Sequence, residues 1–193
     1  KSFKTFTALH ISACISLGTP WFGRDTSAGP VVYVSGEGQG GLKARVEALE
    51  LHLGTELPDL WILPEAVNLL NKQDTAAFLA QLGESGIRPR LVVIDTLQRS
   101  TVGAEENSTK DMGLAVSSAD EIRLQTGAAV LLLHHPTKKD SSVLRGAGSL
   151  SGALDTLISI KRPQPNGNTF TLNCELQKDR EAAFLGSFQM TPS

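Results

Sequence analysis

Four short, continuous apolar runs recur along the first two thirds of the chain. They cover residues 31–34, 60–63, 91–94 and 129–133. Within each run the apolar side chains are consecutive and do not alternate with polar ones. Continuous apolar runs of this length are typical of strands that are buried on both faces of a parallel sheet. The pattern therefore predicts four strands of this kind.

Stretches of helical period separate these runs. Leu42, Val46, Leu49 and Leu53 recur at the spacing of one helix face, and Gly54 follows as a stop signal. The other predicted helices cover residues 2–17, residues 74–83 and a longer stretch whose apolar face runs from 112 to 122. Alternation of strands and helices with short links predicts a doubly wound α/β fold with right-handed crossovers.

The predicted helix ends rest on the usual capping residues. Asp74 is the expected cap of the helix over 74–83, and Asn107 or Ser108 caps the longer helix. Gly18 and Gly127 are expected to end the first and the last helix, because glycine readily adopts the left-handed conformation that closes a helix.

The pattern changes after about residue 155. Residues 157–160 and 169–172 flank Asn166-Gly167, which is a hairpin signal, and a last short strand is expected over 184–190. We therefore expect antiparallel strands at one edge of the parallel sheet. No repeat or linker divides the sequence, so residues 1–193 are predicted to form a single domain.

Composition narrows the class of protein. Hydrophobic residues make up 40% and charged residues 20%, as in an ordinary soluble globular protein, and a net charge of -2 gives the whole molecule no attraction for polyanions. DNA binding would therefore depend on a local basic loop or on an assembled ring. Cys14 and Cys174 lack metal-ligand spacing, and no apolar run is long enough to span a membrane, so a reduced cytoplasmic setting is expected.

Acidic residues follow two of the predicted strands. In open α/β sheets ligands bind beyond the carboxyl ends of the strands, so these positions are the ones to examine. Asp95-Thr96 directly follows the run 91–94, which is the Walker B form, in which the carboxylate serves Mg²⁺. Both Asp95 and Thr96 are expected to bind the nucleotide cofactor. Glu37 follows the first run within a glycine-rich segment and is well placed to act as the general base toward water. A helix cap for Asp95 and a solvated loop for Glu37 are the structural alternatives.

Two histidines, His134 and His135, end the fourth run. One imidazole at such a position could contact the γ-phosphate of a nucleotide and signal its presence. A purely structural histidine is the alternative. A zinc site is less favoured, because adjacent side chains on a strand point in opposite directions and no cysteine cluster joins them.

Lys1-Ser2 precedes the first predicted helix. This pair matches the end of the P-loop pattern G-x-x-x-x-G-K-[ST], in which the lysine reaches the β- and γ-phosphates of ATP and the hydroxyl takes Mg²⁺. The glycines of the pattern and the strand before it are absent from the sequence. The expectation is therefore a domain that is truncated within its phosphate-binding loop.

A polar loop over residues 136–149 carries Lys138, Lys139 and Arg145. Its functional interpretation is a DNA-facing loop, or a source of the arginine that acts in trans on the γ-phosphate of a neighbouring subunit. A plain solvated loop is the alternative. Lys178 and Arg180, after a late strand, are rival candidates for the trans-acting residue.

Taken in order, these segments resemble the RecA-like P-loop ATPases of the plasmid RepA hexameric helicase type, within an AAA-like family. The resemblance spans roughly residues 1–156 and rests on the following segments: Lys1-Ser2, residues 29–37, Arg45, residues 93–97 with Arg99, residues 106–108, residues 133–135 and Arg145-Gly146. It implies that Lys1 binds phosphate, that Ser2 and Asp95 serve Mg²⁺, that Glu37 is catalytic, and that His134 or His135 senses the γ-phosphate.

The same resemblance implies a ring, a homo-hexamer in that family, with single-stranded DNA in its channel. One departure concerns the arginine finger, because no arginine near residues 154–156 matches it. A RecA-like recombination mediator or a regulatory ATP switch without unwinding activity is the main alternative. A degenerate nucleotide-binding module used for assembly is less favoured, since Glu37 and Asp95 are intact.

Overall fold

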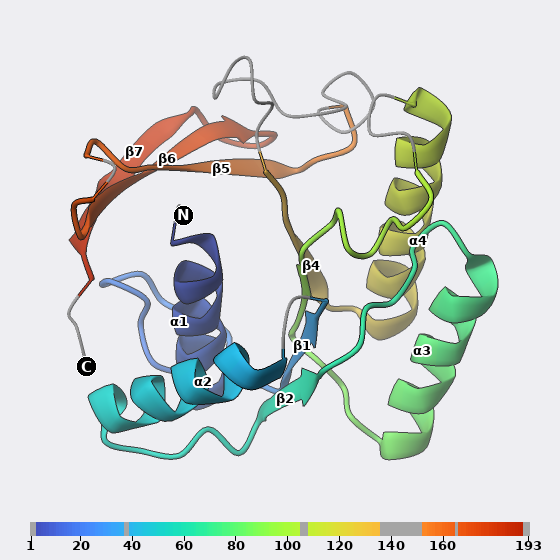
Figure 1. Cartoon of the computed structure of the whole chain (residues 1–193), viewed down its shortest axis with the longest axis horizontal. Coiled ribbons are helices and arrows are strands. Elements are labelled where there is room, and N and C mark those ends of the chain that lie inside the picture. Colours follow the sequence, from blue (N-terminus) through green and yellow to red (C-terminus); the bar gives the residue numbers. More distant parts are fainter. Residues whose placement is uncertain (1–2, 37–38, 105–107, 136–151, 165, 191–193) are drawn as a thin grey trace.

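A computed structural model describes residues 3–36, 39–104, 108–135, 152–164 and 166–190, apart from the side chains of residues 39 and 40. Its helices and strands alternate as far as β4 and are followed by strands alone (Figure 1). In chain order they are α1 (Lys4–Leu17), β1 (Val31–Ser35), α2 (Gln39–Leu53), β2 (Leu60–Leu63), α3 (Lys72–Ser85), β3 (Leu91–Asp95), α4 (Thr109–Thr126), β4 (Ala129–Leu133), β5 (Thr156–Lys161), β6 (Thr169–Gln177) and β7 (Ala183–Gln189).

The four apolar runs form one parallel sheet in the order β2-β1-β3-β4, as the sequence predicts. Every residue of β1 and β3 is buried. Ser35 at the end of β1 lies in register with Asp95 at the end of β3. The chain leaves β1 toward β2 on one side and returns to β3 on the other, so the point where the strand order reverses lies between β1 and β3. Ligands bind at such switch points.

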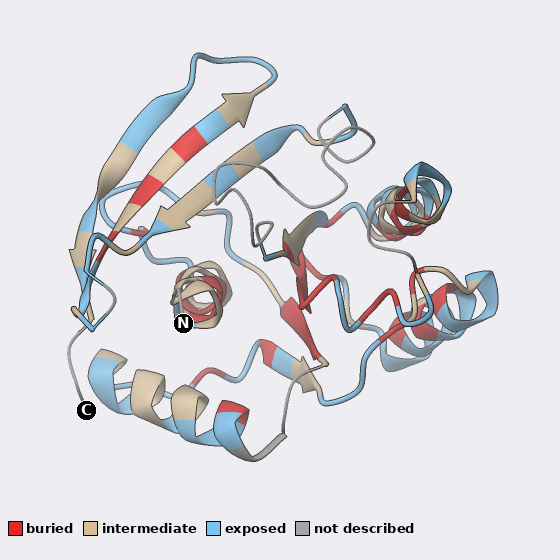
Figure 2. Cartoon of the chain, turned by 45° about the horizontal axis from the view of Figure 1, so that its top comes forward, coloured by how far each residue is buried: buried red, intermediate tan, exposed pale blue. Residues whose placement is uncertain are grey.

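Helices cover both faces of this sheet, which confirms the doubly wound α/β prediction (Figure 2). Successive side chains of a strand point to opposite faces. One set of β1 and β3 side chains therefore packs with α3 and α4, and the other set packs with α1 and α2. The first core contains Val32, Val34, Val92, Ile94, Phe78, Leu82, Met112 and Ile122. The second core contains Val31, Tyr33, Leu91, Val93, Ala8, Leu9, Ala13 and Leu42.

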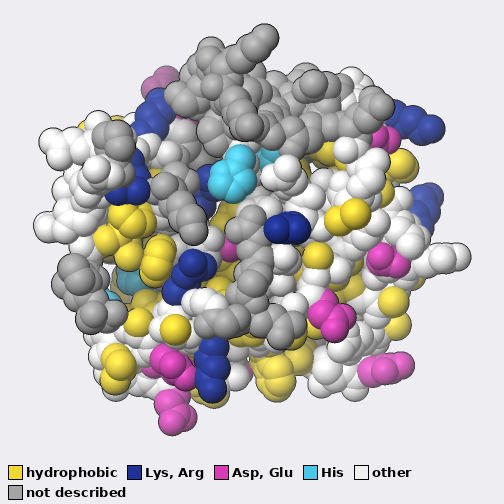
Figure 3. Space-filling model, viewed as in Figure 1, with side chains coloured by type: hydrophobic (Ala, Val, Ile, Leu, Met, Phe, Trp, Pro, Cys, Tyr) yellow, Lys and Arg dark blue, Asp and Glu magenta, His cyan; other side chains and the backbone are white. Residues whose placement is uncertain are grey.

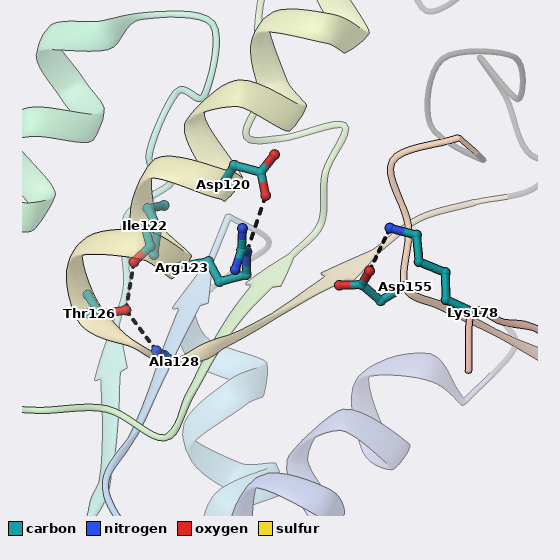
Figure 4. Close-up of polar contacts among 7 residues, drawn as sticks. All are labelled: Asp120, Ile122, Arg123, Thr126, Ala128, Asp155 and Lys178. Carbon is teal, nitrogen blue, oxygen red and sulfur yellow. Dashed lines mark hydrogen bonds and ion pairs between the residues drawn. The ribbon is translucent and has the colours of Figure 1, made fainter. Parts of the chain in front are cut away.

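The helix ends mostly follow the capping signals. Ser108 caps α4, since its hydroxyl accepts a hydrogen bond from the Asp111 amide, and Gly127 ends it with a φ of 72°. At this end Thr126 donates to the Ile122 carbonyl and accepts from the Ala128 amide (Figure 4).

The predicted cap of α3 was wrong. Asn71 is the N-cap, because its side-chain oxygen accepts from the Gln73 amide, and Asp74 lies in the first turn, where it accepts from the Asn71 side-chain amide at 2.8 Å. The carboxylate of Asp74 therefore supports the cap from within the helix, where acidic side chains stabilise the positive end of the helix dipole.

The predicted C-terminal strands are present, and they form a sheet of their own in the order β5-β6-β7. Within the described residues they pair only with one another, so they do not extend the edge of the parallel sheet. Asn166-Gly167 lies within a longer connection between β5 and β6 and does not form a two-residue turn. Phe170 and Leu172 of β6 are buried against Cys14 and Trp21, which seats this sheet beside α1.

No helix in the described ranges is both long enough and apolar enough to cross a lipid bilayer.

Candidate active site

The start of α1 and the carboxyl ends of β1 and β3 lie at the same edge of the parallel sheet (Figure 1). A direct contact joins them, because the Thr5 hydroxyl, in the first turn of α1, donates to Asp95 Oδ2 at 2.8 Å. Lys1 and Ser2, which the sequence assigns to phosphate and Mg²⁺, precede this turn but lie outside the described residues. The edge therefore combines a helix N-terminus, which favours anions, with an acidic strand end.

Asp95 is the central described residue of this edge. Its residue surface is only 4% exposed. Oδ2 accepts hydrogen bonds from the Tyr33 hydroxyl at 2.7 Å and from Thr5. Oδ1 is also buried, and no hydrogen-bond partner for it is found among the described residues. Burial of an acceptor without a partner is unfavourable, and carboxylate oxygens are preferred Mg²⁺ ligands. The donor set at Asp95 therefore fits a magnesium ion held through Oδ1.

Tyr33 stays a hydrogen-bond donor at neutral pH. Burial raises the pKa of its phenol far above the usual range, and the charge of Asp95 and the hydrogen bond to it add to this shift. Neither Tyr33 nor Thr5 was predicted from the sequence as part of the site. A usable signal for Tyr33 was present, because a tyrosine inside a strand buried on both faces needs a partner for its hydroxyl.

Thr96, which the sequence assigns to nucleotide binding, directly follows Asp95 and is 3% exposed. Its hydroxyl is buried, and within the described part of the chain it has no hydrogen-bond partner. The structure thus brings Thr96 to the same edge as Asp95.

The backbone next to Glu37 is fixed by the neighbouring strand. The Gly36 amide donates to the Asp95 carbonyl at 2.8 Å. A Cβ atom on Gly36 would lie 2.5 Å from the Cβ of Arg99, so only glycine fits this close approach. Glu37 itself lies outside the described residues, but the chain enters its segment beside Asp95.

His134 and His135 follow β4, whose last residue, Leu133, is in register with Asp95. His135 Nδ1 lies 3.1 Å from the Lys4 ammonium, so the end of β4 contacts the first turn of α1. On the face shown in Figure 3, histidine and several Lys or Arg side chains gather in the region where Figure 1 shows β4 and the start of α1. The structure therefore brings both histidines to the edge that carries Asp95.

Of the basic residues predicted to contact DNA or to act in trans on a neighbouring subunit, the structure describes two. Lys178 and Arg180 lie in the exposed connection between β6 and β7, on the separate antiparallel sheet. Lys178 Nζ is paired with Asp155 Oδ1 at 2.7 Å (Figure 4), and this hydrogen bond and the charge of Lys178 lower the pKa of Asp155. Lys138, Lys139 and Arg145 lie outside the described residues.

A groove of about 490 Å³ runs beside α1, between α2 and the ends of β6 and β7, and the sequence did not predict it. Its aromatic lining includes Phe6, Phe22 and Phe188, and the Arg45 guanidinium lies 5.2 Å from the centroid of the Phe6 ring. Burial, and then the charge of His52, lower the pKa of His10 in this groove, so its imidazole is neutral at pH 7. The groove is of a size and chemistry suited to a small planar ligand.

The family described as "AAA domain" matches residues 1–141. The chain belongs to the AAA domain family. An AAA domain is a P-loop ATPase domain, which agrees with the ATPase class that the sequence predicts.

The fold of this AAA domain is RecA-like. The crystal structure of the RadB recombinase superposes on it with a TM-score of 0.66, covering 98% of this chain and 83% of that one at 15% sequence identity. Identity at this level supports a shared fold alone. The predicted RecA-like P-loop ATPase class is thus confirmed, whereas the RepA helicase type and the truncation within the phosphate loop remain predictions.

Proposed function

We propose that this domain hydrolyses ATP in a Mg²⁺-dependent reaction at the edge where α1 begins and where β1 and β3 end. The observation that carries the proposal is the buried Asp95 Oδ1, which has no partner among the described residues and lies on a carboxylate bonded to the first turn of α1. Asp95 and Ser2 would hold Mg²⁺, and Lys1 would bind the phosphates. Bound Mg²⁺ supplies charge neutralisation of the phosphate oxygens.

The remaining residues have roles that follow from their chemistry. Glu37 would orient and deprotonate the attacking water, and Thr96 would contact the nucleotide or its metal shell. Lys4 only donates, so His135 accepts through Nδ1 and carries its proton on Nε2. An imidazole N–H at this edge is a suitable donor to a γ-phosphate, which supports a sensing role for His135, with His134 as the neighbouring candidate.

The aromatic groove beside α1 supports a position for the nucleotide base. It is lined by Phe6 of α1, the helix that follows Lys1 and Ser2 in the sequence, and by Arg45 of α2. Rings and guanidinium groups stack well on planar bases. Burial of a base there would leave the triphosphate directed to the start of α1.

The outer edge of β4 supports the proposal that the phosphate loop follows a further strand. In the described part of the chain β4 is an edge strand, although its sequence is entirely apolar. Val130, Leu131 and Leu132 are only half-buried. A strand preceding Lys1 would fit along this edge and complete the burial of β4.

We further propose that the ATPase acts on single-stranded DNA as a homo-hexameric ring of the RepA helicase type. Lys138, Lys139 and Arg145 are the proposed DNA contacts, and Arg145, Lys178 or Arg180 is the proposed trans-acting residue. A recombination mediator or a regulatory switch without unwinding activity is the second candidate, because the fold is shared with a recombinase over nearly the whole chain.

The test uses a full-length protein that carries the phosphate-binding loop. We expect Glu37→Gln to lower ATP turnover by a factor of about 10² or more, the scale of general-base loss, and to leave ATP affinity unchanged. Glu47→Gln, which alters an exposed carboxylate of α2 that pairs with Lys43, is the matched control. Unchanged turnover in Glu37→Gln would remove Glu37 from the mechanism.

The same protein then separates the two DNA functions. Strand displacement driven by ATP supports the helicase, and strand exchange or filament formation without displacement supports the recombination alternative. For either function, Lys138→Ala combined with Lys139→Ala should weaken stimulation by DNA and make its salt dependence shallower, since fewer phosphates are neutralised.

A further inference from the structure

Two hydroxyl groups hold the same carboxylate oxygen at the centre of the site. Tyr33 and Thr5 both donate to Asp95 Oδ2, at 2.7 and 2.8 Å. They come from different elements, β1 and α1, and meet Asp95 at the end of β3. The other oxygen, Oδ1, is the one without a partner among the described residues. The carboxylate is therefore anchored on one side only.

The ring of Tyr33 has little freedom to move. Tyr33 is fully buried, and its ring belongs to the core formed with Ala8 and Leu9 of α1. The torsion that rotates an aspartate carboxylate is intrinsically broad, so it does not fix the direction of either oxygen by itself. Two hydrogen bonds to one oxygen, from a buried ring and from a helix, restrict this rotation and set the direction of the second oxygen.

We propose that Tyr33 and Thr5 are positioning residues, which hold the Asp95 carboxylate so that Oδ1 is directed to the metal of the bound nucleotide. This inference rests on the proposed Mg²⁺ role of Asp95. Thr5 lies on the helix that begins just after Lys1 and Ser2, so its hydrogen bond also fixes the spacing between Asp95 and the phosphate-binding end of α1.

A purely structural role of the Tyr33 and Thr5 hydroxyls predicts a different result. If the two hydroxyls served only to satisfy a buried carboxylate, their loss would lower stability and leave the metal affinity of the folded protein unchanged. Groups that orient a metal ligand act on the metal itself, and their removal commonly weakens metal binding about 10- to 100-fold.

The experiment measures Mn²⁺ affinity by electron paramagnetic resonance, using the full-length protein saturated with adenylyl imidodiphosphate. Tyr33→Phe and Thr5→Val remove one donor each and preserve shape. Each is expected to weaken Mn²⁺ binding about 10- to 100-fold, with Thr5→Ser close to wild type. Affinity for the nucleotide in EDTA is expected to stay unchanged.

Thr75→Val is the matched control, because it removes a buried threonine hydroxyl from the first turn of α3, on the opposite face of the sheet.

The Asp95→Asn variant distinguishes failure of the positioning role of Tyr33 and Thr5 from failure of the proposed metal role of Asp95. If Asp95→Asn weakens Mn²⁺ binding and both donor variants bind Mn²⁺ like wild type, the positioning role is wrong and the proposed ATPase site stands. If Asp95→Asn also binds Mn²⁺ normally, the metal role of Asp95 is wrong. Circular dichroism confirms folding of each variant, and Thr5→Val decides the outcome should Tyr33→Phe fail to fold. Loss of nucleotide affinity in EDTA would assign the hydroxyls to structure alone.

Discussion

The two sheets of this molecule bury their residues in opposite ways. In β3 every residue is buried, because helices cover both faces of the parallel sheet. In β6 buried positions alternate with more exposed ones, because one face packs on α1 and its neighbours and the other meets solvent. The described residues proposed to serve the phosphates and Mg²⁺, other than the rival candidates Lys178 and Arg180, lie on or beside the first sheet. The second sheet contributes Phe188 of β7 to the groove proposed for the base. A fully covered sheet thus supplies rigid strand ends for chemistry, and a half-covered sheet tolerates change.

The largest expected difference between the two sheets is in the stability that is lost when an apolar side chain is truncated. One isoleucine from each sheet allows the comparison. Ile94 of β3 is fully buried and Ile158 of β5 is 42% exposed. We expect Ile94→Ala to lower the free energy of unfolding by about 2–5 kcal/mol, through lost burial and a residual cavity. Ile158→Ala should lower it by less than about 1 kcal/mol. Urea denaturation measures both, and equal losses would contradict the contrast between the sheets.

A smaller effect on stability is expected at the end of β1, where the backbone of Gly36 lies close to the Arg99 side chain. Gly36→Ala would bring a methyl group against the Arg99 side chain, so we expect a loss of about 1–3 kcal/mol in stability. Gly113 of α4 has open space around it, and Gly113→Ala should stabilise the domain by about 0.5–1 kcal/mol, since alanine favours helix. Thermal unfolding of the two variants should therefore shift in opposite directions. A stabilising Gly36→Ala would refute the close approach.

The smallest effect is expected on the half-covered sheet, at the exposed pair of Lys178 and Asp155. The pKa of Asp155 is lowered in the folded protein, so the small stability that the pair contributes is present above the ordinary aspartate pKa of about 4 and is lost as the pH falls. In Lys178→Met the pKa of Asp155 should rise toward its ordinary value, which a carboxyl NMR titration detects. At neutral pH the unfolding midpoint should not change measurably, because exposed ion pairs contribute little.

The sequence alone predicted much of the parallel sheet, because the signals for its strands and helix ends lie within short stretches of the chain. Continuous apolar runs identify strands such as β1 and β3, and an aspartate directly after such a run identifies Asp95 as a candidate ligand. Helix ends at Gly18 and Gly127 also follow from single residues with a special conformation. The cap of α3 was misassigned because Asn71 and Asp74 are both capping residues, and only the backbone geometry decides between them.

Features that depend on contacts between distant segments were not predictable in this way. Tyr33 and Thr5 meet Asp95 across 62 and 90 positions of sequence, respectively, and no local pattern records that meeting. The aromatic groove likewise combines side chains from α1, α2 and β7. The separation of β5–β7 from the parallel sheet depends on which strands become neighbours, and alternation within one strand does not contain that information.

Within the residues that the structure describes, the apolar strand β4 lies at the edge of the parallel sheet, and this has a practical consequence for handling the polypeptide. An edge strand presents a row of backbone N–H and C=O groups, and such a row is a template for another chain. Ala129–Leu133 contains no charged side chain and no proline that would discourage such pairing. Two copies would therefore pair strand to strand as their concentration rises, and a short peptide that occupies this edge should keep the polypeptide dispersed.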